Sequence, residues 1–87
     1  MSEKLAPDLL YETLSDGEAA LLDVHRRHFF TLNESAKYIF ERLQQGASFD
    51  SISTDMAAEF EVDEAECRHD IDAFLSELRS RGMLIGD

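Results

Sequence analysis

The hydrophobic positions near the start of the chain alternate with polar ones, as they do in strands that bury one face. Residues 9–14, 18–24 and 28–32 each combine leucine, valine or aromatic side chains at this short period. Residues 15–17 (Ser-Asp-Gly) separate the first two runs, and an Asp-Gly pair there is a strong hairpin signal. Residues 25–27 (His-Arg-Arg) contain none of the usual turn formers, yet they separate the second run from the third. We therefore predict a three-stranded antiparallel meander with the second strand in the middle.

After residue 32 the period lengthens to that of amphipathic helices, and three helices are predicted. Asn33, Ser48 and Asp63 stand at their starts and can cap them, and Asp63 also has capping-box spacing with Glu66. Gly46 suits the left-handed position that ends the first helix. The stripes predicted to face the core are Ala36, Ile39, Phe40 and Leu43; Phe49, Ile52, Met56 and Phe60; and Cys67, Ile71, Phe74, Leu75 and Leu78.

Strands first and helices afterwards indicate an α+β fold. We expect residues 83–85 (Met-Leu-Ile) to fold back onto the core and residues 1–8 to form a flexible N-terminus. Residues 9–87 would then make one domain, because a second core does not fit in a chain of 87 residues.

Composition narrows the class of function. The formal net charge is −11, which would repel the phosphates of DNA or RNA and so argues against a winged-helix DNA binder. The partner is expected to be a neutral or basic peptide or protein. A single cysteine, Cys67, excludes an internal disulfide and suits a reducing cytoplasm. No apolar run reaches the about 20 residues that span a bilayer, so we expect a cytoplasmic protein without membrane contact.

The third predicted strand is an edge strand without the usual protection against further strand pairing. The first strand has Pro7, Asp8 and Glu12, whereas residues 28–32 (HFFTL) hold neither proline nor a full charge. Three explanations stand side by side: the third helix or residues 83–85 cover this edge, a peptide adds to it as a strand, or two copies of the chain pair through it. If Phe30 points into the core, Phe29 faces the other side; the pattern leaves that choice open.

The ordered set of elements resembles the PqqD-like family, whose domains recognise leader peptides of ribosomally made, modified peptides. The resemblance rests on Leu-Asn-Glu at residues 32–34, Gly46 after the first helix, Val-Asp-Glu at residues 62–64, and Gly-Met-Leu at residues 82–84. It extends over nearly the whole chain from residue 9. The turn at residues 25–27 departs from the family pattern, in which Gly or Asn is more usual.

This resemblance implies a winged helix-turn-helix-like fold that binds peptide rather than DNA. The leader would lie as an added strand along the third strand, in a cleft closed by the third helix. The domain would act as a peptide chaperone without a cofactor and deliver the leader to a radical S-adenosylmethionine enzyme or another peptide-modifying enzyme. Such domains serve pyrroloquinoline quinone and lasso-peptide maturation. The peptide-binding residues it implies are His28, Phe29, Phe30, Thr31, Cys67, Asp70, Ile71 and Phe74.

Several of these side chains have a plainer explanation. Ile71 and Phe74 would equally suit ordinary core packing, and Asp70 would suit a solvated helix face. Cys67 and His69 are two residues apart on a helix, which is not the spacing of a helical metal pair. No phosphate loop or nucleophile motif occurs, so we expect no catalysis and no metal. The alternative function is a structural or regulatory protein that forms a homodimer through the same edge.

Overall fold

The structure is a computed structural model that describes residues 3–15 and 17–86 of the chain. Three strands, β2 (Leu9–Ser15), β3 (Glu18–Asp23) and β4 (His28–Leu32), form an antiparallel sheet in the order β2-β3-β4. Three helices follow, α1 (Glu34–Gln44), α2 (Phe49–Phe60) and α3 (Glu64–Ser80). The predicted α+β meander followed by three helices is thus confirmed. Asp16 of the predicted hairpin turn lies outside the described residues.

Two of the three predicted helix caps are formed. The side-chain oxygen of Asn33 accepts a hydrogen bond from the backbone N–H of Ala36 at 2.9 Å, and Ser48 Oγ accepts one from the N–H of Ser51 at 3.1 Å. Asp63 makes no side-chain cap bond, so the predicted capping box of α3 is wrong. The first turn of α3 instead carries two glutamates, whose charge favours the positive end of the helix dipole.

A single core lies between the sheet and the helices. α1 packs against β3, β4 and α3, and α2 packs against α3. Met83 and Leu84 join this core, which confirms that the chain folds back after α3. None of the helices in the described ranges combines the length and the hydropathy needed to cross a membrane. The largest completely buried side chains are Phe40, Leu21, Leu32, Ile39, Ile52, Ile71, Leu78, Met83, Cys67 and Ser53.

The side chain of the last residue of β3, Asp23, stabilises the turn between β3 and β4. Asp23 is 6% exposed, and its Oδ1 accepts a hydrogen bond from the backbone N–H of Arg26 at 3.2 Å. Arg27 adopts the left-handed conformation, with φ of 58°. Residues 25–27 therefore turn sharply although they contain no typical turn former, because the last residue of β3 supplies the acceptor.

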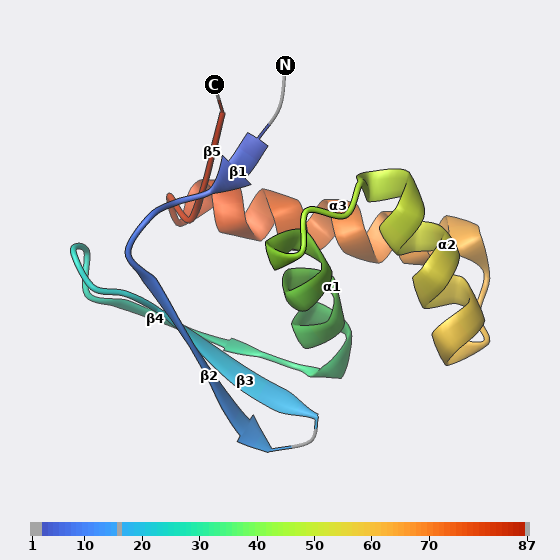
Figure 1. The fold of residues 1–87 in the computed structure, drawn as a ribbon, viewed down its shortest axis with the longest axis horizontal. Coiled ribbons are helices and arrows are strands. Elements are labelled where there is room, and N and C mark those ends of the chain that lie inside the picture. Colours follow the sequence, from blue (N-terminus) through green and yellow to red (C-terminus); the bar gives the residue numbers. More distant parts are fainter. Residues whose placement is uncertain (1–2, 16, 87) are drawn as a thin grey trace.

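A second, two-stranded sheet was not expected from the sequence. β1 (Glu3–Leu5) pairs antiparallel with β5 (Leu84–Gly86), so part of the segment predicted to be loose has a partner at the opposite end of the chain. Figure 1 shows this pair beside the end of α3. The C-terminal strand therefore pairs with β1 and not with β4.

The structure decides which face of β4 points inward. Leu32 is completely buried and Phe30 is half-buried against the core, whereas Phe29 is 62% exposed and Thr31 is also exposed. Figure 1 shows the three helices on one side of the β2-β3-β4 sheet. Phe30 and Leu32 face that side, and Phe29 faces the side that no helix covers.

Candidate functional site

The outer edge of β4 is open. β3 occupies one edge of β4, and no other strand within residues 3–15 and 17–86 pairs with its opposite edge. The explanation that residues 83–85 cover this edge is wrong, because β5 pairs with β1. An edge of this kind carries backbone N–H and C=O groups that can bond an incoming extended chain.

A cleft of about 330 Å³ adjoins this edge and separates it from α3. Phe30 contributes from β4, Asn33 and three residues of α1 follow it, and four residues come from α3. Because α1 begins directly after β4, the strand and the helix start form one continuous wall opposite α3. The lining residues are Phe30, Asn33, Ser35, Ala36, Ile39, Asp70, Ala73, Phe74 and Glu77.

Two aromatic rings form the apolar part of this cleft. The rings of Phe30 and Phe74 are stacked with their centroids 6.2 Å apart and an interplanar angle of 25°. The guanidinium of Arg81 lies over the same Phe30 ring, 4.3 Å from its centroid, and its Nε donates to Glu77 Oε2 at 2.8 Å. The Phe30 ring therefore contacts both Phe74 in α3 and Arg81 at the C-terminal end of that helix.

Arg26 connects the β3–β4 turn to the same end of α3. Its Nη1 donates a hydrogen bond to the backbone oxygen of Arg81 at 3.2 Å. The link brings together the start of β4 and the end of α3, which are the two walls of the cleft. Arg26 and Arg81 thus link the two walls at that end.

The polar part of the cleft combines the acidic side chains of α3 with Asn33 and Ser35. Asp70 and Glu77 both lie on α3 and line it, and Glu77 is the acceptor of the Arg81 hydrogen bond. An acidic rim on a protein of formal net charge −11 attracts basic partners and accelerates their encounter. The electrostatics of the cleft thus suit a neutral or basic peptide.

The structure brings some of the predicted peptide-binding residues together. Phe30, Asp70 and Phe74 line the cleft, and His28 and Thr31 are exposed on the open strand beside it. Phe29 belongs to the same strand, but its ring points to the opposite face of the sheet.

Cys67 and Ile71 lie outside the reach of a peptide in this structure. Both are completely buried in the core, so a direct contact would require α3 to move. Burial, and after it the negative charge of Asp70 and Glu66, raises the pKa of the Cys67 thiol. The thiol therefore stays protonated at neutral pH, which removes the reactive thiolate form.

Sequence reasoning missed several cleft residues. Ala73 and Glu77 follow Asp70 by three and seven positions, so extending the helical spacing from Asp70 would have found them. Ser35 and Ala36 lie in the first turn of α1, and the sequence pattern assigns only Ala36, to the stripe that faces the core. Their contribution depends on how α1 leaves β4, which the spacing of residues does not reveal.

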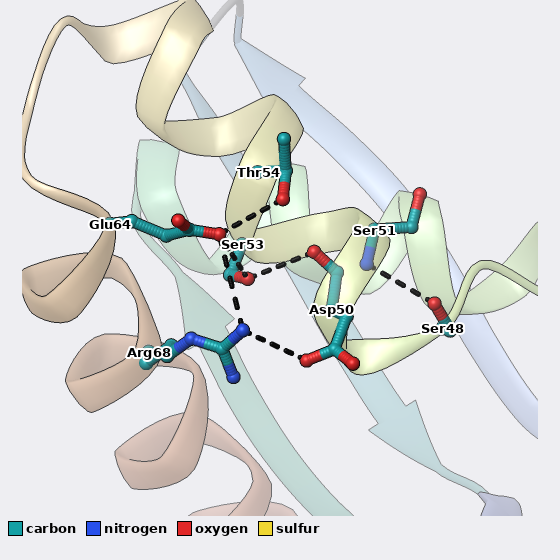
Figure 2. A network of polar contacts seen from close by, with 7 residues as sticks. All are labelled: Ser48, Asp50, Ser51, Ser53, Thr54, Glu64 and Arg68. Carbon is teal, nitrogen blue, oxygen red and sulfur yellow. Dashed lines mark hydrogen bonds and ion pairs between the residues drawn. The ribbon is translucent and has the colours of Figure 1, made fainter.

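A polar network joins α2 to α3 away from the cleft (Figure 2). Arg68 donates to Asp50 Oδ1 at 2.9 Å and lies 4.0 Å from Glu64 Oε2. The same Glu64 oxygen accepts hydrogen bonds from the hydroxyls of Thr54, at 2.9 Å, and Ser53, at 3.4 Å. Every carboxylate in this network has a cationic or hydroxyl partner. We therefore interpret the network as a structural contact that holds α3 against α2, and not as a reactive site.

Among the described residues, no group of three or more histidine, cysteine, aspartate or glutamate side chains is placed to hold a metal ion. A larger hollow, of about 500 Å³, lies at the β1–β5 pair and the turn between α1 and α2. It adjoins no open edge of the β2-β3-β4 sheet. The cleft beside β4 is therefore the stronger candidate site.

Comparison with known proteins gives the family. The family model described as coenzyme PQQ synthesis protein D (PqqD) matches residues 18–84, which is more than three quarters of the chain. This chain belongs to the PqqD family. The matched span runs from β3 to the first residue of β5 and contains both walls of the cleft. A search of curated proteins finds no significant match.

Two solved leader-peptide complexes contain chains that are similar in structure to this PqqD-family chain. "TbiB1 in Complex with the TbiA(beta) Leader Peptide" has a TM-score of 0.87 and 25% identity, over 97% of this chain and 96% of that chain. "Lasso peptide synthetase B1 complexed with the leader peptide" has a TM-score of 0.87 and 27% identity, over 99% of this chain and 100% of that chain. Both comparisons extend over essentially the full length, so the similarity is not confined to one part of the PqqD-family fold.

Proposed function

We propose that this chain binds the leader segment of a ribosomally made precursor peptide and presents it to a separate peptide-modifying enzyme. The leader adds to the open edge of β4 as an antiparallel or parallel strand. Alternate leader side chains then enter the cleft between β4 and α3. The chain acts as a carrier of the peptide and performs no chemistry on it.

The open edge of β4 beside an apolar, acid-rimmed cleft carries this proposal. Main-chain hydrogen bonds along an open edge give affinity for any extended peptide, and an adjoining pocket gives preference for particular side chains. Phe30 and Phe74 supply the apolar surface, and Asp70 supplies a charge for a basic leader residue. The two solved relatives are both described as complexes with leader peptides, which supports the same class of ligand here.

The peptide-modifying enzyme is a proposal on the same basis. The family model is described as a coenzyme PQQ synthesis protein, and one solved relative as lasso peptide synthetase B1. One description names a biosynthetic role and the other a peptide synthetase, which supports delivery of the leader to an enzyme that modifies peptides. A radical S-adenosylmethionine enzyme or another peptide-modifying enzyme is therefore the partner to which the leader would be delivered.

A titration followed by backbone amide shifts tests the leader-binding proposal. The probe is the leader of a precursor peptide encoded beside this chain, added to isotope-labelled protein. We expect the shifts to concentrate at residues 28–32 and along residues 70–77. Shifts that appear on dilution of the protein without peptide would instead identify homodimerisation through the same edge. No shift with the neighbouring leader would overturn the proposal.

A further inference from the structure

The side of the β2-β3-β4 sheet opposite the helices carries a contiguous apolar surface, which we call the outer face. It consists of Leu10, Leu14, Leu22 and Phe29, which are 56%, 55%, 36% and 62% exposed and line one depression. The strand register places Leu10 opposite Leu22 and Leu22 opposite Phe29, so one row of large apolar side chains crosses all three strands.

This surface differs from the scattered exposed leucines of ordinary monomers. Single exposed apolar side chains are common, but a contiguous group surrounded by polar residues usually marks an interaction surface. The outer face is also hollowed, with a depression of about 350 Å³ between β2 and β4. Glu12 is the charged residue that lines this depression.

The outer face continues onto the proposed leader site. Successive side chains of a strand point to opposite faces, so a leader strand added to β4 would send alternate side chains into the cleft and onto the outer face beside Phe29. The row from Leu10 to Phe29 would then extend onto the peptide. A protein bound to the outer face would contact the carrier and the leader at the same time.

A second copy of this chain fits the outer face poorly. Two copies facing each other about a twofold axis would bring Glu12 of each into one apolar interface, and both carry a formal net charge of −11. A partner with an apolar surface and a lysine or arginine opposite Glu12 would bury the apolar side chains of this face and also pair its charge. Charge complementarity therefore favours a different protein over self-association.

We propose that the outer face docks the peptide-modifying enzyme, which meets Leu10, Leu22 and Phe29 with an apolar surface and Glu12 with a basic side chain. This inference rests on the proposed function, because it assigns the surface through which the carrier and its bound leader reach that enzyme. The carrier thus uses two neighbouring surfaces of one sheet: the edge of β4 binds the leader, and the outer face binds the enzyme.

Two outer-face variants and two matched controls test the assignment. Leu10→Ser removes apolar surface and Glu12→Lys reverses the charge, and both positions are exposed. As controls, Val62→Ser also replaces an exposed apolar side chain by serine, and Glu59→Lys makes the same charge reversal, both near the turn between α2 and α3. For each folded variant, as checked by circular dichroism, the affinities for the neighbouring leader and for the modifying enzyme encoded beside this chain are measured separately.

We expect Leu10→Ser and Glu12→Lys to weaken enzyme binding by about tenfold or more, while leader binding stays within about twofold of wild type. Both controls should leave both affinities unchanged. Unchanged enzyme binding in the outer-face variants would overturn the inference, and so would a parallel loss of leader binding. A wild-type dimer abolished by Leu10→Ser would assign the face to a second copy instead. If wild type binds no leader, the proposed function itself fails.

Discussion

Phe29 and Phe30 are adjacent and chemically alike, yet they face different surroundings because a strand turns successive side chains to opposite faces. Phe30 stacks on Phe74 and lies under Arg81, so it belongs to the cleft. Phe29 is 62% exposed on the outer face. A pattern of two consecutive aromatics cannot tell which of them faces the core, and the sequence left that choice open for this reason.

Phe30→Ala should weaken leader binding by about tenfold or more, because it removes the aromatic wall that an inserted leader side chain would contact. Phe49→Ala is the matched control, since Phe49 is also a half-buried phenylalanine that packs against the core, but from α2. Calorimetric titration with the leader measures both affinities. Equal losses in the two variants would show that general destabilisation, and not the cleft, causes the effect.

Tyr11 on β2 and Glu41 on α1 form a polar contact between the sheet and the helix. The Tyr11 hydroxyl donates to Glu41 Oε2, and Lys37 Nζ donates to the same oxygen at 3.1 Å. The Tyr11 hydrogen bond lowers the pKa of the Glu41 carboxyl, with Lys37 adding to the shift and burial opposing it. Burial, followed by the hydrogen bond and charge of Glu41, raises the pKa of Tyr11 to about 12.

These shifts predict how the contact depends on pH. Because the pKa of the Glu41 carboxyl is lower in the folded than in the unfolded protein, the contact adds stability above the unfolded pKa of about 4.3. This stability is lost as the pH falls through the folded pKa. A raised tyrosine pKa adds stability below about pH 10, which is lost as the pH rises towards 12. Tyr11→Phe should therefore cost about 1 kcal/mol of unfolding free energy near neutral pH and less on either side. Urea unfolding across this range measures it, and a pH-independent difference would contradict the assignment.

At the scale of elements, the two glycines that follow α1 and α3 occupy similar backbone conformations but different surroundings. Gly46 has φ of 82° and no atom within 4 Å of the position of an added Cβ. Gly82 has φ of 74°, and an added Cβ would lie 1.4 Å from Arg26 Nη1. Arg26 is the residue that ties the β3–β4 turn to the end of α3.

Alanine at either glycine should lower the unfolding free energy by about 1–2 kcal/mol, because a side chain is disfavoured in the left-handed conformation. Only Gly82→Ala should also weaken leader binding, because it displaces Arg26 and loosens the end of the cleft. Urea unfolding and leader titration of both variants separate the two effects. Equal leader affinities would show that the Arg26 link does not position the cleft walls.

Local signals predicted most elements, and long-range contacts account for what was missed. Asn33 and Ser48 cap their helices through bonds that span three residues, so the sequence carries that information directly. β1 and β5 have three residues each and come from opposite ends of the chain, so neither shows a recognisable period. The family resemblance implied a cleft between the edge strand and α3; Phe30, Asp70 and Phe74 line it, whereas Cys67 and Ile71 face the core.

For the whole molecule, the formal net charge of −11 should act on the rate of leader binding more than on its lifetime. We expect the association rate of a basic leader to fall as NaCl is raised from about 50 to about 500 mM, with a smaller change in the dissociation rate. Stopped-flow fluorescence measures both rates. A leader with its lysines and arginines replaced by glutamine is the control, and an equal salt dependence for it would contradict the prediction.

The most direct test of strand addition is amide hydrogen exchange along β4 with and without the leader. Free protein should protect alternate amides of residues 28–32, which bond to β3, and leave the others to exchange rapidly. With saturating leader, the rapidly exchanging amides of β4 should become protected, while those on the outer edge of β2 stay unchanged. Bound leader without new protection in β4, or with protection on β2 instead, would contradict the account.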